Sequence, residues 1–453
     1  MYLVNGKLNN KLTLVATKLT KISQQYSYSL QDQKIVFYLN PKHFCFRQFN
    51  WMIRGLFGKI NKSFNVDLNS FLSIIPNNFH QAVITCVLCN CEYFNNLPFN
   101  LKTSKNNEIN VNFIINNEYQ KLLKVSKVMV EANNFARKMQ LMPNNYMNPT
   151  TFAEMIKKTF KPFNNLLDIK VLNKSDLVKK RMGLILSVGN ASNQKHEPKL
   201  VSIKFKNSKP KFAIIGKGIT FDTGGINLKP TNHLVGMQYD MSGAAIAAGV
   251  MYAFCLNKMK PNLAVVMPLA VNEIGDNCTK VGDVIISYSK KTVEITNADA
   301  EGRLILADGI TYAIKDLGVK SVTTIATLTG AIIIALGDLY TGFWSTNLAN
   351  IDLFNKAAKA TGEYVWNLPF HQYFSDSLKN SLLADLINSV EKPNGSSISA
   401  ACFLKEFTNG VDFIHLDIAG TSEFKARGKS YPIPIMINTL FEFIKENFYG
   451  NKK

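Results

Sequence analysis

The 453-residue sequence lacks a long uninterrupted apolar run. Its first residues mix asparagine, lysine and apolar side chains, so they do not form the apolar centre of a secretory signal peptide. The apolar window at 325–337 is interrupted by Thr327, Thr329 and Gly330, and it is shorter than the roughly 20 residues that cross a bilayer. We therefore expect no membrane association and a cytoplasmic location.

The sequence also has few charged residues, 19% of the total, against 46% hydrophobic residues, which excludes a disordered chain. Its length exceeds the roughly 250–300 residues that a single core serves, so we expect two domains. The seven cysteines cluster only at 86, 89 and 91, and no second C-x-x-C or histidine pair could complete a zinc site with them. We interpret these three as reduced thiols in an apolar strand at 82–88, with a zinc half-site as the alternative.

Several catalytic motifs are missing. The sequence contains no P-loop, no H-E-x-x-H and no G-x-S-x-G. Gly216 and Gly218 follow an apolar run in the manner of a dinucleotide-binding loop, but Phe221 stands at the third glycine position. The six histidines fall in no metal-ligand spacing, so we expect them to be structural.

The chain has few acidic residues relative to basic ones, and its formal net charge is +20. Residues 1–130 contain 15 lysines and arginines against 5 aspartates and glutamates, so half of the surplus lies in less than a third of the chain. A basic region of this kind can bind nucleic acid by neutralising phosphates. Because the lysines are dispersed and form no basic run, nucleic-acid binding is a secondary hypothesis.

The pattern along the chain predicts two domains and a connector. Short β-prone runs at 34–39, 82–88 and 109–115 are separated by asparagine-rich turns. Helical spacing then extends over 118–142, and a Thr-x-x-Glu capping box after Pro149 opens a second helix. The predicted parts are a smaller, basic N-terminal α/β domain at 1–117, a linker helix and connector at 118–145, and a larger C-terminal domain at 146–453.

The larger domain alternates apolar runs with small-residue helical segments. This alternation predicts an α/β fold whose central sheet is mostly parallel and covered by helices. In such sheets, sites form at the carboxyl ends of the strands. The predicted strands are 183–188, 212–215, 263–268 and 321–326, and the predicted helices are 243–256 and 304–315.

Three segments, 215–229, 238–245 and 297–304, place charged residues among glycines and alanines. If the segments converge, their carboxylates bring a formal charge of about −4 into a restricted space, at a desolvation cost of several kcal/mol each. Lys229 and Arg303 cannot offset all of it, whereas two divalent cations can, and carboxylate oxygens suit Mg, Mn or Zn. The carboxylates are Asp222, Asp240, Asp299 and Glu301.

The spacing Asp299-x-Glu301-x-Arg303 predicts three side chains on one face of an extended segment, where one carboxylate could bridge two ions. Each residue also has a purely structural interpretation. Asp240 could cap the helix that follows it, and Lys217 could be a lysine at a strand end whose ammonium reaches solvent. Only the combination of all these residues favours a metal site.

The same segments resemble the signatures of the leucyl aminopeptidase family. Asn297-Ala-Asp299-Ala-Glu301-Gly-Arg303-Leu is similar to that family's Asn-Thr-Asp-Ala-Glu-Gly-Arg-Leu, and 217–229 and 238–245 resemble two further signatures. The resemblance continues through 326–331, 366–369 and 415–420 and covers roughly residues 140–445. It implies a metal-dependent aminopeptidase that releases leucine and other mainly apolar N-terminal residues from peptides, and that assembles as a homohexamer.

The resemblance also implies roles for individual residues. Lys229 would polarise the scissile carbonyl, and Arg303 would hold a bicarbonate ion that acts as the general base. The implied ligands of two divalent ions per subunit, Zn or Mn with Mg or Co as alternatives, are Lys217, Asp222, Asp240, Asp299 and Glu301. The implied substrate-pocket residues are Met237, Asn297, Thr327, Leu328, Gly330 and Ala419. The alternatives are a nucleic-acid-binding or regulatory protein on the same scaffold, and a metallohydrolase of another bond.

Overall fold

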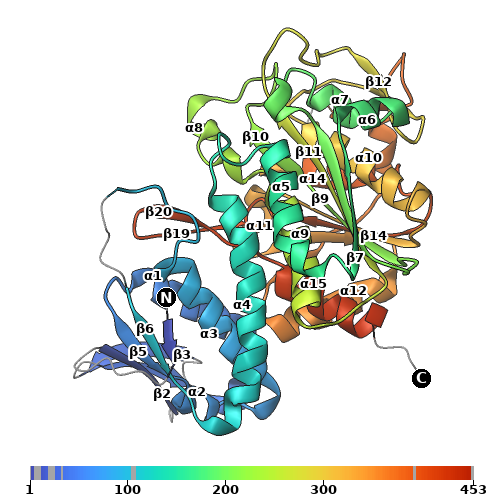
Figure 1. Cartoon of the computed structure of the whole chain (residues 1–453). Helices are drawn as coiled ribbons and strands as arrows, with labels where there is room; N and C mark the ends of the chain where they lie inside the picture. Colours follow the sequence, from blue (N-terminus) through green and yellow to red (C-terminus); the bar gives the residue numbers. More distant parts are fainter. Residues whose placement is uncertain are drawn as a thin grey trace.

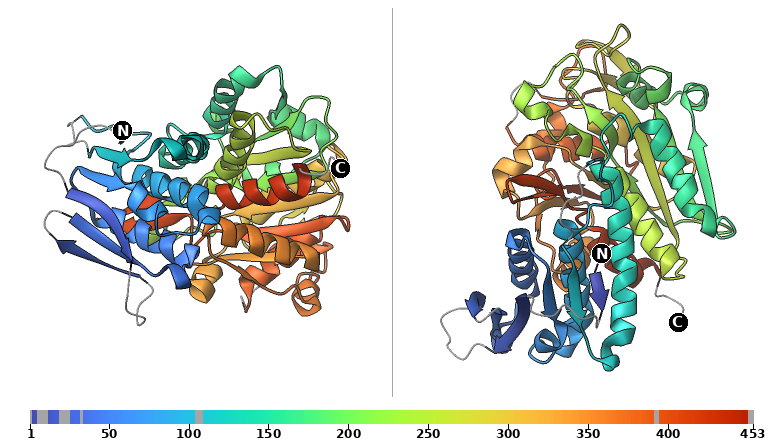
Figure 2. Two further views of the ribbon diagram at one scale, coloured as in Figure 1. Left: turned by 90° about the horizontal axis from the view of Figure 1, so that it is seen from below. Right: turned by 60° about the vertical axis from the view of Figure 1, so that its left-hand side comes forward.

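The computed structural model describes residues 2–4, 12–18, 26–31, 34–103, 109–390 and 394–449. Within these residues the chain forms a smaller and a larger β-sheet, each packed with helices (Figure 1). The long helix α4 (Gln120–Leu141) runs alongside both parts, as the right-hand view of Figure 2 shows. The predicted α/β fold class is therefore confirmed.

The first sheet is mostly parallel, in the order β1-β6-β5-β2-β4-β3, and its β3–β4 pair is antiparallel. Phe37, Phe64 and Phe113 have no solvent exposure and fill the sheet's covered face. Helices α1 (Phe46–Lys59) and α3 (His80–Asn95) lie between this sheet and the larger part of the molecule (Figure 1). The remaining elements are β1 (Tyr2–Val4), β2 (Leu12–Lys18), β3 (Tyr26–Gln31), β4 (Lys34–Leu39), β5 (Phe64–Asp67), α2 (Leu68–Leu72) and β6 (Val111–Ile114).

Two arginines fasten the helices of the smaller part. Arg427, in the turn of the hairpin β19 (Glu423–Ala426)–β20 (Lys429–Pro432), donates to the carbonyls of Gly58 and Phe94 at 3.0 Å each. Arg137 of α4 is fully buried and donates to Glu92 O at 2.8 Å. Both satisfy carbonyls at the carboxyl ends of helices, where the macrodipole is negative. Apart from these hydrogen bonds, the smaller and larger parts of the molecule share one apolar core, which continues onto a face of the larger sheet.

The larger sheet has the order β16-β15-β18-β14-β9-β11-β8-β7, with β10 paired to β11. The pairs β18–β14, β14–β9, β9–β11 and β10–β11 are parallel, so the centre of the sheet is parallel as predicted. The strands are β7 (Leu167–Leu172), β8 (Lys199–Phe205), β9 (Phe212–Gly216), β10 (Gly218–Asp222), β11 (Leu263–Asn272), β14 (Ser321–Ala326), β15 (Thr341–Ser345), β16 (Val365–Asn367) and β18 (Asp412–Asp417).

Helices α9 (Ser242–Leu256) and α10 (Glu301–Lys315) cover opposite faces of this sheet. Alternate residues of a strand point to opposite faces, and in β9 Ile214 packs into the α9 core whereas Ile215 packs into the α10 core. The α9 face also carries α5 (Pro149–Phe160), α12 (Leu348–Thr361) and α15 (Ile437–Ile444). The α10 face carries α6 (Lys174–Lys180), α7 (Gly183–Val188) and α14 (Ser396–Lys405). Shorter elements are α8 (Thr231–Leu234), α11 (Gly330–Leu336), α13 (Gln372–Ser377), β12 (Val284–Ile286), β13 (Thr292–Glu294) and β17 (Leu386–Ile387).

One stretch, Thr231–Leu256, is long and apolar enough to cross a membrane by composition, and 83% of its most apolar window is buried inside the molecule. Its second half is α9, whose residues pack in the core between the sheet and α4. This burial identifies α9 as a core helix.

Two predicted strands and one predicted cap are wrong. Residues 82–88 lie in α3 and residues 183–188 form α7, because a short apolar run does not distinguish a strand from a buried helix. Helix α7 is fixed from elsewhere in the chain, since the Asp308 carboxylate accepts the Leu184 and Ile185 N–H groups at 3.0 and 3.1 Å. The cap of α5 is Asn148 paired with Thr151, not a Thr-x-x-Glu box.

Candidate metal centre

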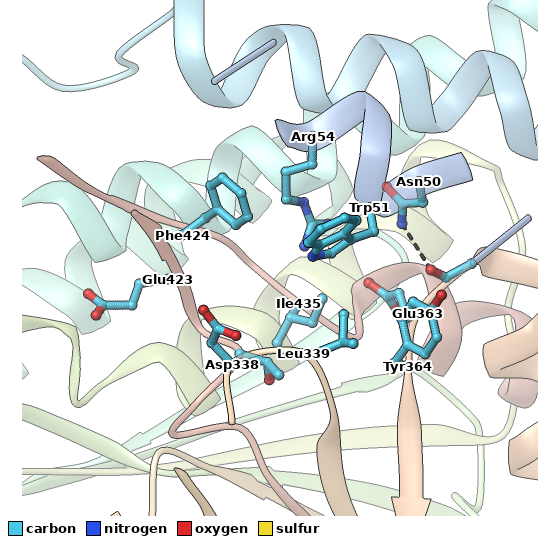
Figure 3. Close-up of a pocket in the computed structure, with 12 residues that line it drawn as sticks. Asn50, Trp51, Arg54, Asp338, Leu339, Glu363, Tyr364, Glu423, Phe424 and Ile435 are labelled. Carbon is cyan, nitrogen blue, oxygen red and sulfur yellow. Dashed lines mark hydrogen bonds between the residues drawn. The ribbon is translucent and has the colours of Figure 1, made fainter. Parts of the chain in front are cut away.

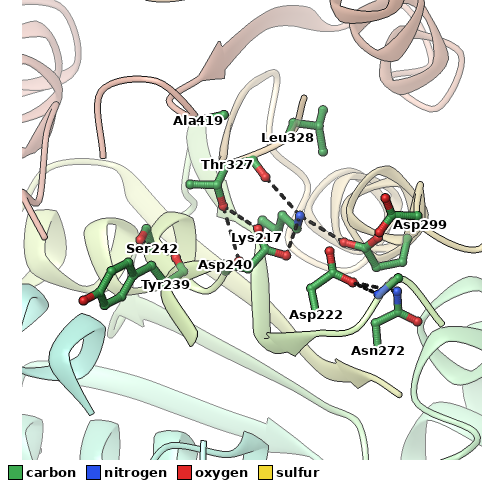
Figure 4. A network of polar contacts seen from close by, with 12 residues as sticks. Lys217, Asp222, Tyr239, Asp240, Ser242, Asn272, Asp299, Thr327, Leu328 and Ala419 are labelled. Carbon is green, nitrogen blue, oxygen red and sulfur yellow. Dashed lines mark hydrogen bonds and ion pairs between the residues drawn. The ribbon is translucent and has the colours of Figure 1, made fainter. Parts of the chain in front are cut away.

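Charged residues from separate segments meet at the carboxyl edge of the larger sheet (Figure 4). Lys217 directly follows β9, and Asp222 is the last residue of β10. Asp240 lies two residues before α9 and Glu301 opens α10, so both are at helix amino ends. Strand ends and helix starts meet at this edge in parallel α/β sheets. The predicted convergence of the acidic residues is therefore present.

Lys217 lies at the centre of the cluster. Its Nζ is 2.7 Å from Asp240 Oδ2 and 3.0 Å from Glu301 Oε1, and it donates to Thr327 O at 3.0 Å. The lysine is only 3% exposed. A Cβ atom at Gly302 would lie 2.5 Å from Lys217 Cε, so glycine at this position leaves room for the lysine side chain.

Lys229 bridges the other two carboxylates. Its Nζ lies 2.9 Å from Asp222 Oδ2 and also forms an ion pair with Asp299. The second oxygen of Asp222 accepts the N–H of Gly224 at 2.9 Å and Asn272 Nδ2 at 2.8 Å. Oxygens of Asp222, Asp299 and Glu301 lie within 4.8 Å of one another. One cation could therefore contact all three carboxylates.

Burial and mutual repulsion make the carboxylates hard to ionise without cations. Burial raises the pKa of Asp240 to about 7, against the opposing charge of Lys217. Burial and then the charge of Asp222 raise the pKa of Glu301 to about 8. Burial lowers the pKa of Lys217 and Lys229, but the surrounding carboxylates outweigh it and raise both above the ordinary value. Without bound cations, the ammonium groups of Lys217 and Lys229 are the counter-ions of the carboxylates.

The residues of this cluster fit divalent cations. Both carboxylate oxygens of Glu301 are buried and neither has a hydrogen bond among the described residues, although a buried carboxylate oxygen without a hydrogen bond is costly. Carboxylate oxygens are the ligands of hard and borderline divalent ions. Lys217 could bind an ion only as the neutral amine, so ion binding there requires loss of its proton.

Arg303 is held next to the cluster by a residue that the sequence did not single out. Its Nη1 donates to Asn388 O at 2.8 Å, and burial lowers its pKa to about 10. Asn388 is fully buried, and its side chain accepts the Thr296 N–H at 2.8 Å and donates to Asn297 O at 2.7 Å. Asn388 thus fixes both Arg303 and the loop that leads to Asp299.

Two of the predicted pocket residues touch the cluster directly. Thr327 Oγ1 donates to Asp240 Oδ1 at 2.7 Å, and Asn297 Oδ1 accepts the Asp299 N–H at 2.8 Å. Met237 begins the 3-10 turn whose last residue, Tyr239, precedes Asp240. Thr327 and Asn297 therefore contact the carboxylate cluster directly, and Met237 precedes one of its members by three residues.

The remaining pocket residues form a neighbouring wall. The N–H groups of Leu328 and Ala419 donate to one oxygen of Asp417 at 3.1 and 3.2 Å, so this buried carboxylate ties the two loops together. Gly330 is the first residue of α11, and a Cβ built there meets no atom within 4 Å. The open space next to Gly330 leaves room for a substrate side chain.

One local prediction is wrong here, and one structural alternative is excluded. Glu301 and Arg303 lie in the first turn of α10, so Asp299, Glu301 and Arg303 do not share a face of an extended segment. The chain instead enters the helix between Asp299 and Glu301, which turns Glu301 toward Lys217. Asp240 does not cap α9, whose N-cap is Met241 without a side-chain hydrogen bond. Its carboxylate is engaged by Thr327 and Lys217.

The fold and the cluster together define a class, an α/β protein whose buried carboxylates at the carboxyl edge of the sheet could hold divalent cations. Residues 134–440 match the model described as "Cytosol aminopeptidase family, catalytic domain". The chain belongs to this family and is accordingly a hydrolase of the aminopeptidase class.

Proteins described as cytosol aminopeptidases are similar to this chain over most of its length. The "Probable cytosol aminopeptidase" of Mycoplasma genitalium is 39% identical over 407 residues, 88% of this chain and 89% of that protein. The protein of the same description from Metamycoplasma salivarium is 37% identical, over 95% of this chain and 82% of its own length. The "Cytosol aminopeptidase" of Rickettsia prowazekii is 38% identical over 73% of this chain and 67% of its own length. The similarity thus extends beyond the catalytic segment.

Proposed function

We propose that this aminopeptidase releases leucine and other mainly apolar N-terminal residues from peptides, with two divalent cations held by Lys217, Asp222, Asp240, Asp299 and Glu301. The observation that supports the proposal is the meeting of four carboxylates at one point, with a buried Glu301 oxygen that has no partner among the described residues. Zn and Mn are the proposed ions, with Mg or Co as alternatives.

Bound cations would supply Lewis acidity and lower the pKa of the attacking water. In our proposal Lys229 leaves its ion pairs with Asp222 and Asp299, donates from Nζ to the scissile carbonyl oxygen, and stabilises the negative charge that develops there. Arg303 holds bicarbonate as the general base, with its guanidinium oriented by the carbonyl of Asn388. The open space at Gly330, beside Leu328 and Ala419, receives the first side chain of the substrate.

The experiment that tests this function is hydrolysis of leucyl-p-nitroanilide with added Mn²⁺ or Zn²⁺. We expect Asp222→Ala and Glu301→Ala to abolish it, because each removes a proposed metal ligand. Asp352→Ala, which removes an exposed carboxylate on α12, is the matched control and should retain activity. Activity that persists in both ligand variants would reject the proposed site.

We also propose that the chain assembles as a homohexamer in the cytoplasm. Large apolar side chains of the larger part are strongly exposed in the single chain, among them Ile334 at 90%, Leu348 at 81% and Leu382 at 102%. Association with further copies of the chain would bury these side chains. Sedimentation should give a mass of six chains, and a monomeric native protein would contradict the assembly. Cell fractionation tests the location.

A secondary proposal is nucleic-acid binding through the basic N-terminal third. Lys121, Lys124 and Lys127 are exposed along the first two turns of α4, where they form one positively charged stripe. Changing all three to glutamate should weaken DNA retention and lower its salt dependence by about three units of slope. Retention that is unchanged in this variant would remove the stripe from consideration.

A further inference from the structure

A cavity of about 320 Å³ lies where the smaller part of the molecule meets the larger one. Its walls come from α1, α3 and α4 on one side and from α12, α15 and Glu363 on the other. The cavity contains none of the residues of the metal centre. Its volume is within the range of small-molecule sites, which begins at roughly 300 Å³. The mechanism proposed above makes no use of it.

Arg54 of α1 is the fixed cation of this cavity. Its Nε donates to Asn90 Oδ1 at 3.0 Å, and Asn90 Nδ2 donates in turn to Asn50 Oδ1 at 3.0 Å and to Cys86 O at 2.9 Å. This network fixes the plane of the guanidinium. The two terminal nitrogens of Arg54 have no hydrogen bond or ion pair within the described part of the chain. They remain available to a ligand.

The carboxylates that line the cavity are already engaged. Glu363 is buried, and its two oxygens accept the Met436 N–H, at 3.0 Å, and the Thr439 hydroxyl. Burial raises the pKa of Glu363, and its hydrogen bonds and the charge of Arg54 partly oppose this rise. Both oxygens of Glu442 are 2.8 Å from Lys445 Nζ. Neither acid lies within ion-pair distance of Arg54, so no direct contact with a carboxylate occupies its guanidinium.

The rest of the lining mixes polar side chains, such as Gln81, Thr85 and Asn438, with an apolar part. Ala82, Val125, Met129 and Phe441 face the cavity, and the thiol of Cys86 is neutral because burial raises its pKa to about 12. A planar guanidinium with two free nitrogens matches the two oxygens of a carboxylate. The apolar walls match a hydrocarbon side chain. The combination is complementary to a small molecule with a carboxylate at one end and an apolar body.

A second, smaller cavity limits where such a molecule can lie. It shares Asn50, Arg54 and Glu363 with the larger one, but its volume is only about 30 Å³. Figure 3 shows Asn50, Trp51 and Arg54 of α1 facing Glu363 and Tyr364 across it. A space of this size holds about one or two waters. The ligand must therefore occupy the larger cavity, with its carboxylate toward Arg54.

We propose that the cavity between the two parts of the molecule is a second ligand site, which binds a small apolar monocarboxylate through Arg54. This site is separate from the peptidase reaction and does not depend on metal binding.

The test is titration calorimetry of the full-length protein with isocaproate, a branched aliphatic monocarboxylate without an amine. We expect saturable binding to the native protein and at least a tenfold loss of affinity in Arg54→Gln, since the guanidinium–carboxylate pair is lost. Lys59→Gln removes the same charge from an exposed position of α1 and should bind as the native protein does. The uncharged isocaproamide should bind at least tenfold more weakly than isocaproate.

A second variant addresses the apolar half of the site. Ala82→Phe fills part of the cavity and should lower isocaproate affinity at least tenfold, while thermal melts show whether each variant is folded. Glu301→Gln alters the metal centre only and should leave the affinity unchanged. The proposal is overturned if the native protein does not bind isocaproate, or if folded Arg54→Gln and Ala82→Phe both bind it with native affinity.

Discussion

Two regions of the larger part bury carboxylates in different ways. Asp308 has no solvent exposure, and its oxygens accept three backbone N–H groups, from Leu184, Ile185 and Tyr288, at 3.0, 3.1 and 2.8 Å. Glu301 is buried as deeply, but it faces Lys217 and other carboxylates, and its Oε2 has no partner among the described residues. Burial raises the pKa of both, to about 7 for Asp308 and about 8 for Glu301.

Burial and a raised pKa therefore do not separate a structural carboxylate from a functional one in this protein. The difference lies in the partners, because backbone donors satisfy Asp308 fully whereas the oxygens of Glu301 are left for an ion. If this distinction is correct, replacing Asp308 should lower the stability of the protein, whereas replacing Glu301 should lower its activity.

The largest expected effect is that of Glu301→Gln on catalysis. We expect kcat/KM for leucyl-p-nitroanilide to fall at least about a thousandfold, or roughly 4 kcal/mol, because a ligand of both proposed ions is lost. The thermal midpoint of the metal-free protein should be little changed near neutral pH, since a carboxyl with a pKa of about 8 is mostly uncharged there and glutamine has the same size. A large loss of metal-free stability with normal activity would reverse the comparison.

Asp308→Ala should show the opposite pattern. It leaves three buried N–H groups without an acceptor and should lower the free energy of unfolding by about 3 kcal/mol, as measured by urea denaturation. The activity per folded molecule should remain close to native. Asp352→Ala, at an exposed position, is the control and should change stability by less than about 0.5 kcal/mol.

Asn272→Ala should give an intermediate effect on ion binding. Its Nδ2 donates to Asp222 Oδ1 at 2.8 Å and to Ala298 O at 3.1 Å, so it orients one proposed ligand and the neighbouring loop. We expect Mn²⁺ affinity, measured by calorimetry, to fall about 10- to 100-fold. Asn257→Ala removes an amide at the far end of α9 and should leave Mn²⁺ affinity unchanged. Equal affinities in the two variants would show that Asn272 does not support the site.

The smallest effect is a change in pH dependence. Burial raises the pKa of Asp240, Glu301 and Asp308 to about 7, 8 and 7, above the ordinary values of 3.8, 4.5 and 3.8. The folded state therefore binds more protons than the unfolded state between these limits. Stability of the metal-free protein should therefore fall as pH rises, by a few degrees in thermal midpoint between about pH 5 and pH 8.

Saturating Mn²⁺ should remove the share of this slope that comes from Asp240 and Glu301, because ions favour the deprotonated carboxylates. The part of the slope that comes from Asp308 should remain when Mn²⁺ is bound. It should be absent from the Asp308→Asn variant. A slope that is identical with and without Mn²⁺ would place the titrating groups outside the cluster.

The sequence predicted the α/β class, the strands at the centre of the larger sheet and the convergence of the acidic residues. These predictions succeeded because long periodic segments, and charged residues among small ones, can be recognised in the local sequence. The strand predictions for 82–88 and 183–188 failed because both segments are mostly apolar and lie in helices, and a short apolar run does not distinguish the two structures. No local pattern reveals that Asp308, more than a hundred residues away, caps α7.

The supporting asparagines could not be predicted either. Asn272 and Asn388 are single asparagines in an asparagine-rich chain, and only the fold brings them to Asp222 and Arg303. The geometry at Glu301 was also mispredicted, because Asp299-x-Glu301 has the spacing of a strand although α10 begins within it. Sequence therefore identified which residues meet, but not how they are held.

The stem of Lys217 occupies the position that any side chain at 302 would take. A side chain at position 302 and the lysine side chain at position 217 would therefore compete for the same space, although the two positions are far apart in the chain. An engineered chain that carries alanine at 302 must move the ammonium away from Asp240 and Glu301, and a shorter residue at 217 would be needed to make the alanine tolerable. Substitutions at these two positions should be accepted as a pair and rejected singly, which makes the pair a marker of this site in mutational libraries.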